Sequence, residues 1–230
     1  MTESAVLGVD GCRGGWVGIV LGPDPAAPPR GVHGTTMADL VAEAAGVAGP
    51  APLAVIGVDM PVHLGDAWPR PGDVAARAHL GRKASSLFVT PPAAAYGAPT
   101  YAEACTVARE LTGGWAPSRQ AWALGPKIAE VGAWAPDAPC GVHEVHPEVS
   151  FSLMAGAPLL ARKFSWAGHA ARRAALAAQG IVVPDDLGVA GRAGADDVLD
   201  AAAVAWTARR LAAGTAVSFP DPPVPSSVWA

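Results

Sequence analysis

The sequence predicts an α/β domain with a mixed five-stranded sheet, in the order β-β-β-α-β-α-β-α, and a helical insertion between strands four and five. Short apolar segments alternate with turns and with segments of helical period, as strands and helices do. Hydrophobic residues make up 51% of the 230 residues and charged residues only 16%, which suffices for a core and excludes wholesale disorder. We expect one domain over residues 1–230, with the insertion at residues 60–140.

The first four strands come from apolar segments near the N-terminus. The glycine-rich turn GCRGG joins the first two segments, which favours an antiparallel hairpin. Before the fourth, Thr36 is placed to cap a helix over Met37–Ala45, which Gly46 would end. These strands are expected at Ala5–Asp10, Trp16–Leu21, Gly31–Thr35 and Leu53–Val58.

The rest of the chain is mainly helical. A fifth strand is expected at Gly141–Val145, and the last helix, Asp196–Ala213, would be capped by an aspartate and ended by Gly214. The other helices are expected at Asp73–Leu80, Tyr101–Leu111, Gln120–Trp134 (disturbed at Gly125-Pro126) and Glu148–Met154.

Charge and cysteine content narrow the classes of function. The net charge of −4 excludes a domain that binds nucleic acid by bulk charge alone, so contact with a polyanion would need a local basic patch or bound cations. The three cysteines are far apart and form no CxxC pair, which argues against a disulfide scaffold and a cysteine zinc site. Without a leader-like N-terminus or a long apolar segment, we expect a cytoplasmic protein that does not enter the membrane.

Acidic side chains follow two of the predicted strands. Asp10 and Asp59 each stand where an apolar strand ends, and they become neighbours if the first and fourth strands lie side by side and parallel. Asp197 and Asp200 are three residues apart and share one face of the last helix. Such a cluster of like charges is costly unless divalent cations neutralise it, and carboxylate oxygens suit Mg²⁺ or Mn²⁺.

A purely structural interpretation of the helical acids also stands. Asp196 would then cap the last helix, and Asp197 and Asp200 would be solvated acids stabilised by the helix dipole.

Several longer motifs resemble those of the DUF429 family, described as predicted RNase H-like nucleases. They cover nearly the whole chain and stand in the same order as in the family. The motifs are VLGVDGCRGGWV (Val6–Val17), IGVDMPVHL (Ile56–Leu64), RPGDVAARAHLGRKASSLF (Arg70–Phe88), SRQAWALGPKI (Ser118–Ile128), EVHPEVSF (Glu144–Phe151) and DDVLDAAAVAWTA (Asp196–Ala208).

The resemblance implies an RNase H-like fold and metal-dependent hydrolysis of a phosphodiester, in nucleic acid or a nucleotide-like phosphate. The D-x-x-D-A motif of the last helix also resembles the end of RuvC-type resolvases. By that analogy, the metal-binding and catalytic carboxylates are Asp10, Asp59, Asp197 and Asp200, holding Mg²⁺ or Mn²⁺.

The EVHPEVSF motif offers two interpretations. Glu148 would be a further catalytic group, as a metal ligand or general base, with His146 assisting proton transfer or binding phosphate. Alternatively, Pro147 and Glu148 simply begin a helix, where proline fits the first position and glutamate suits the dipole.

One basic segment is a candidate phosphate-binding lip above the acidic site, because arginine grips phosphate with two donors. An ordinary helix salt bridge between Asp73 and Arg77 is the structural alternative. A second basic set (Arg162, Lys163, Arg172 and Arg173) is expected to decorate a surface helix. The lip would comprise Arg70, Arg77, Arg82 and Lys83, joined by Arg13 from the glycine turn.

Two other functions stay open. The GVDGCRGG turn is similar to the phosphate hairpin of the actin and sugar-kinase superfamily, which would make the chain a nucleotide-binding phosphotransferase. A non-catalytic binding module is the third possibility, and it predicts that the four aspartates do not converge. The sequence leaves the substrate and the oligomeric state open.

Overall fold

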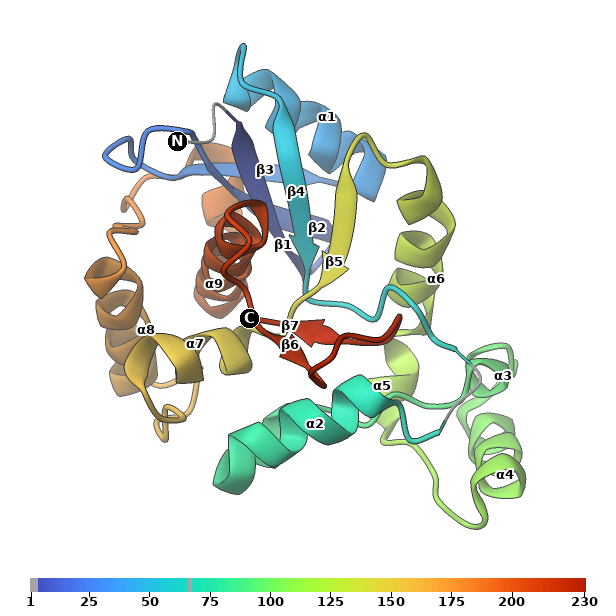
Figure 1. Ribbon diagram of the computed structural model, residues 1–230. Coiled ribbons are helices and arrows are strands. Elements are labelled where there is room, and N and C mark those ends of the chain that lie inside the picture. The colour runs from blue at the N-terminus through green and yellow to red at the C-terminus, as the bar shows by residue number, and fades with distance from the viewer. Residues whose placement is uncertain (1–3, 66–67) are drawn as a thin grey trace.

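A five-stranded mixed sheet forms the centre of the computed structural model, which describes residues 4–65 and 68–230 (Figure 1). The strands lie in the order β3-β2-β1-β4-β5. β1, β2 and β3 are antiparallel, whereas β4 is parallel to both β1 and β5. The expected mixed sheet is thus confirmed. The strands are β1 (Ala5–Cys12), β2 (Gly15–Leu21), β3 (Arg30–Gly34), β4 (Leu53–Val58) and β5 (Gly141–Glu144).

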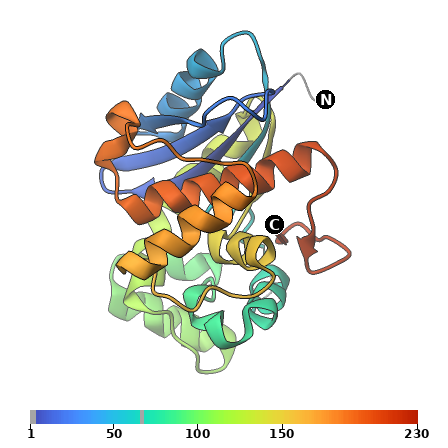
Figure 2. The ribbon, with the colours of Figure 1, turned by 90° about the vertical axis from the view of Figure 1, so that its left-hand side faces the viewer.

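Helices cover both faces of the sheet. On one face lies α9 (Ala195–Ala212), backed by α7 (Pro147–Ala155) and α8 (Trp166–Ala178), and Figure 2 shows α8 and α9 side by side. On the other face lie α1 (Met37–Ala48) and α6 (Gly125–Trp134) (Figure 1). Each face has its own apolar core, so the domain has three layers.

The sequence of β1 shows why α9 lies so close to the sheet. Val9 packs towards α1, while Gly8 turns its bare backbone to α9. A Cβ atom at Gly8 would stand 2.0 Å from the backbone nitrogen of Ala205, so the close contact requires glycine. The alanines of α9 around this point are fully buried. The helix therefore packs directly on the strand backbone.

The remaining helices come between β4 and β5 in the sequence, and most of them lie in the lower part of Figure 1. Two 3₁₀ segments accompany them, Gly81–Ser86 and Ala135–Asp137, and a third, Gly188–Arg192, precedes α9. Within the ranges described, no helix is long and apolar enough to cross a membrane. The helices of this region are α2 (Pro71–Leu80), α3 (Ala93–Tyr96), α4 (Tyr101–Thr112) and α5 (Arg119–Ala123), followed by α6.

The proline-rich C-terminal segment is ordered by pairing. It forms a small hairpin of β6 (Ser218–Phe219) and β7 (Val228–Trp229), and Trp229 bridges to Val145 beyond the end of β5. The hairpin contacts α2 and β5, so it closes one side of the helical region.

Several boundaries differ from the sequence expectation, among them the end of β1, which runs past Asp10 to Cys12. Thr36 caps α1 as expected, but the helix runs through Gly46 and ends before Gly49, which takes the positive φ of 68°. The N-cap of α9 is Gly194 rather than an aspartate. The helix expected at Gln120–Trp134 is divided into α5 and α6, consistent with the expected disturbance at Gly125-Pro126.

Candidate functional site

A cleft of about 740 Å³ opens between the carboxyl ends of the parallel strands and the helical region. One part of its lining is acidic and belongs to β1, to the residue after β4, and to α9. We call these five side chains the acidic cluster: Asp10, Asp59, Asp196, Asp197 and Asp200.

The register of the two central strands places Asp10 beside Asp59. Val9 pairs with Val58 in the parallel ladder, and the Asp59 backbone N–H donates to the Val9 carbonyl at 2.9 Å. The next residues, Asp10 within β1 and Asp59 just after β4, therefore lie at the same end of the two strands and on the same face of the sheet. Asp10 is 6% exposed, and its Oδ1 accepts a hydrogen bond from the Gly11 N–H at 2.6 Å.

Helix α9 brings the other three acids to these strands. Its contact with Gly8 fixes the helix against β1, and its first turns extend from there towards the strand end. Asp196 and Asp197 lie in the first turn, where the helix dipole favours negative charge, and Asp200 lies one turn further on. Asp200 is 2% exposed. The structure thus brings together Asp10, Asp59, Asp197 and Asp200, as expected if they act as one site.

Lys163, which was expected on a surface helix, contacts the acidic cluster instead. Lys163 lies in the segment between α7 and α8, and its Nζ is 2.7 Å from Asp200 Oδ2 and 3.4 Å from Asp196 Oδ2. Among the residues with described positions, it is the only cation that forms a salt bridge with the cluster. One ammonium group therefore faces five carboxyl groups.

The pKa values of the cluster reflect this excess of acid. Burial, and next the charge of Asp59, raise the pKa of Asp10 well above its usual value. Burial, followed by the charge of Asp200, likewise raises the pKa of Asp59. Burial raises the pKa of Asp200 to about 6 even though Lys163 opposes the change. Burial is thus the main cause of the raised pKa values, and neighbouring carboxylates add to it at Asp10 and Asp59.

The donor set of the cluster fits a hard divalent cation. All the donors are carboxylate oxygens, and Asp200 Oδ1 is buried and accepts no hydrogen bond from the described part of the chain. In residues 4–65 and 68–230, no three acidic, histidine or cysteine side chains already stand as a ligand group. Binding a metal would therefore require the side chains around Lys163 to rearrange.

Glu148 and His146 also line the cleft. Glu148 Oε1 accepts a hydrogen bond from the fully buried guanidinium of Arg172. Arg172 was expected on a helix surface; it lies on α8 but points into the core. Burial lowers the pKa of His146 to about 4, with Lys163 adding to the effect, so its imidazole is neutral at pH 7. It therefore offers no charge to a phosphate.

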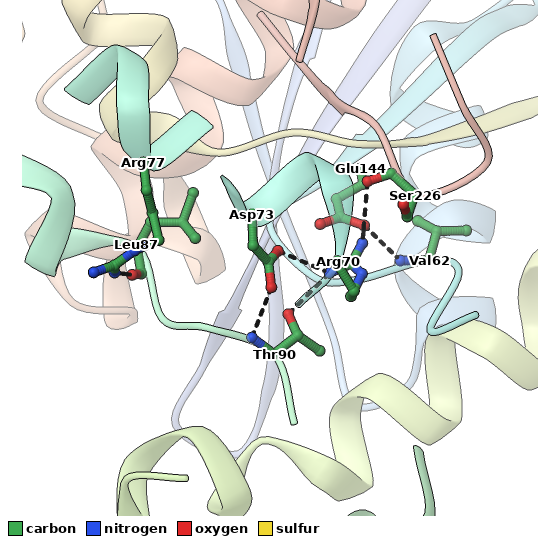
Figure 3. Close-up of polar contacts among 8 residues, drawn as sticks. All are labelled: Val62, Arg70, Asp73, Arg77, Leu87, Thr90, Glu144 and Ser226. Atoms are coloured by element: carbon green, nitrogen blue, oxygen red, sulfur yellow. Dashed lines mark hydrogen bonds and ion pairs between the residues drawn. The ribbon is translucent and has the colours of Figure 1, made fainter. Parts of the chain in front are cut away.

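Arg70 does not belong to a phosphate-binding lip. Its side chain is 2% exposed and its guanidinium binds Glu144, Asp73 and the Thr90 hydroxyl (Figure 3). We call these four residues the Arg70 group. Asp73 also accepts from the Thr90 N–H at 2.7 Å, and Glu144 from the Val62 N–H at 3.2 Å. Burial raises the pKa of Glu144 to about 7 despite Arg70. The group ties α2 to β5 and to the loop at Thr90.

The other predicted lip residues are scattered. Arg77 donates to the Leu87 carbonyl (Figure 3) and to the Ala84 carbonyl, not to Asp73. Arg13 and Arg82 are exposed and do not line the cleft. Of the five residues expected there, only Lys83 does.

The sequence did not assign several residues that complete the cleft. Arg162 and Phe164 come from the segment of Lys163, Phe88 follows the 3₁₀ segment after α2, and Tyr96 and Gln120 come from the helical region. Phe88 stands at the end of a motif and Gln120 inside another, so motif membership was the available indication. The segment at Arg162 has no such indication.

Comparison with known proteins identifies a family. The family model described as "Protein of unknown function (DUF429)" matches residues 8–224, most of the chain. No curated protein and no solved structure matches the chain.

Proposed function

The chain belongs to the DUF429 family, and we propose that it is an RNase H-like, metal-dependent phosphodiester hydrolase acting on nucleic acid or a nucleotide-like phosphate. The main support is the acidic cluster, in which five carboxyl groups line one cleft and, among the described residues, only Lys163 forms a salt bridge with them. Charges arranged in this way are expensive unless cations join them.

The order of the strands supports the RNase H-like assignment. The sequence predicts the element order β-β-β-α-β-α-β-α, in which the first and fourth strands can lie side by side and parallel, and the resemblance implies metal-binding acids at these two strands and on the last helix. The sheet order β3-β2-β1-β4-β5 and the positions of Asp10, Asp59 and Asp200 agree with this pattern.

Asp10, Asp59, Asp197 and Asp200 are the residues that would hold Mg²⁺ or Mn²⁺. Such ions, when bound, supply an activated water and neutralise charge that develops on the phosphate. The protein surrounds them with buried carboxylates, and burial strengthens each electrostatic interaction at the site.

Two further residues would prepare the cleft for a phosphodiester. Lys163 carries a positive charge on a side chain that is 32% exposed, so it can attract a phosphoryl oxygen from the open side. Arg172 orients Glu148 by holding Oε1, while Oε2 accepts no hydrogen bond from the part of the chain that is described. That free oxygen can accept a proton from an attacking water.

A non-catalytic module predicts that the four aspartates stay apart, whereas they converge. The convergence therefore favours the hydrolase over a binding module. A phosphotransferase remains an outcome of the test, because it would bind ATP at the turn formed by Gly11–Gly15.

The test compares the wild-type protein with Asp10→Asn. Single-stranded, duplex, hybrid and branched oligonucleotides are incubated with Mg²⁺, Mn²⁺ or EDTA, and cleavage is followed on gels. We expect metal-dependent cleavage that falls by at least about a thousandfold in Asp10→Asn. Asp137→Asn, which changes an exposed acid outside the cleft, is the matched control and should keep full activity. ATP binding without cleavage of any substrate would overturn the proposal.

A further inference from the structure

Three aromatic side chains are exposed among the fourteen Phe, Trp and Tyr residues; two of them line the cleft, and the third follows one of these closely in the sequence. Phe88 is 36% exposed and Phe164 is 74% exposed, and both line the cleft from different segments. Trp166 is 89% exposed and lies two residues after Phe164. The other aromatic residues are buried or half-buried. Exposed aromatic rings that line one cleft indicate a binding surface.

Cations stand among these rings. Arg162 and Lys83 line the same cleft, and within the described ranges neither forms a salt bridge. Each is therefore available to a ligand, in a protein whose net charge is −4. Lys163 lies beside them, with its Nζ 5.4 Å from the centre of the Phe164 ring.

We propose that this mouth, formed by Lys83, Phe88, Arg162, Phe164 and Trp166, binds a few unpaired nucleotides, and that the substrate is therefore single-stranded nucleic acid or a single-stranded end. This inference rests on the proposed function and narrows its substrate class. Aromatic rings stack on the face of any base, and free cations pair with the phosphates between bases. In a duplex the base faces are already covered by stacking, so these rings would have no partner.

The depth of the acidic cluster favours the same substrate. Asp10 and Asp200 are 6% and 2% exposed, so a reacting phosphate must enter the cleft to reach them. A flexible single strand can bend inwards, whereas a stiff duplex stays at the surface. Two free cations provide few phosphate contacts, so stacking must supply much of the affinity and the footprint is short.

The test measures binding separately from cleavage. A fluorescein-labelled 12-nucleotide DNA, its RNA equivalent and the matching blunt duplex are titrated with protein in EDTA and in Ca²⁺, and fluorescence anisotropy gives Kd. We expect either single strand to bind at least about tenfold more tightly than the duplex, and Phe164→Ala and Trp166→Ala each to weaken that binding about tenfold. Arg162→Ala should reduce the slope of log K against log salt by about 0.7.

Leu111→Ala is the matched control. Leu111 is 60% exposed on α4 and does not line the cleft, so its truncation should leave Kd unchanged. Because all four truncated side chains are exposed, thermal unfolding of each variant should match wild type, which separates lost contacts from lost folding.

The outcomes also separate this inference from the proposed function. Equal binding of duplex and single strand, no binding of any oligonucleotide, or ring variants that match Leu111→Ala would overturn the single-strand site. If the protein nevertheless cleaves a phosphodiester through Asp10, the hydrolase stands. Ring-dependent binding without metal-dependent cleavage supports the single-strand site and removes the hydrolase.

Discussion

The acidic cluster and the acids of the Arg70 group line one cleft, yet their charges are neutralised very differently. In the Arg70 group one guanidinium serves two carboxylates, and each carboxylate also accepts a backbone N–H. In the acidic cluster one lysine serves five carboxyl groups, and Asp200 Oδ1 has no hydrogen-bond donor among the described residues. The first arrangement stabilises the fold, while the second leaves negative charge available to a ligand.

The largest effect on stability is expected from removing the cation of the Arg70 group. Arg70→Met should lower the free energy of unfolding by about 3–5 kcal/mol, because Glu144 and Asp73 would remain buried without their cation. Chemical denaturation at pH 7.5 measures the change. Arg82→Met, at an exposed arginine outside the cleft, is the control and should change little. A loss as small as that of the control would show that the Arg70 group does not hold the fold.

An intermediate effect is expected from Asp200→Asn, and it should depend on pH. The pKa of Asp200 is raised to about 6 in the folded protein, so folding favours its protonated form. Wild-type stability relative to Asp200→Asn should therefore fall as pH rises from about 4 to about 6, by about 1–3 kcal/mol. His146, whose pKa is lowered, acts in the opposite direction but is common to both proteins. Urea denaturation of the two metal-free proteins at pH 4.5 and 7.5 gives the difference in their free energies of unfolding. If this difference is the same at both pH values, the pKa of Asp200 is not raised in the folded protein.

The smallest effect is expected from Lys163→Met. Loss of the only cation bound to the acidic cluster, within the residues described, should destabilise the metal-free protein by about 1 kcal/mol at pH 7.5. Mn²⁺ should then raise Tm more in the variant than in wild type, because no ammonium competes for the carboxylates. Thermal unfolding with and without Mn²⁺ measures both. An equal or smaller rise in the variant would mean that Lys163 and the cation do not share a site.

The sequence predicted mainly those features of the fold that depend on short-range patterns. The segments before Asp10 and Asp59 are clear apolar runs, and the element order allows the parallel pairing of the first and fourth strands that the structure shows. Thr36 was recognised as the cap of α1 by its type and position. Such features depend on neighbours in the sequence.

The predictions that the structure contradicts concern basic side chains whose partners lie far away in the sequence. Arg70 was expected at a phosphate, but it meets Glu144, which lies 74 residues later. Lys163 and Arg172 belong to a basic segment with the composition of a surface, yet Arg172 is fully buried and Lys163 reaches the acidic cluster. Whether an arginine or lysine points to solvent or to a buried acid is decided by packing between remote segments, which local composition does not record.

Gly8 has a consequence for the spacing of the acids. Asp10 and Asp200 each lie a short way along the chain from the point where the backbones of β1 and α9 touch. Backbone atoms cannot change rotamer as side chains do, so this contact in the core holds the helix at a fixed distance from the strand. Enlarging residue 8 would push the helix away and widen the gap between the carboxyl groups. The spacing of the carboxyl groups in the cleft is thus set from a position that does not itself line the cleft.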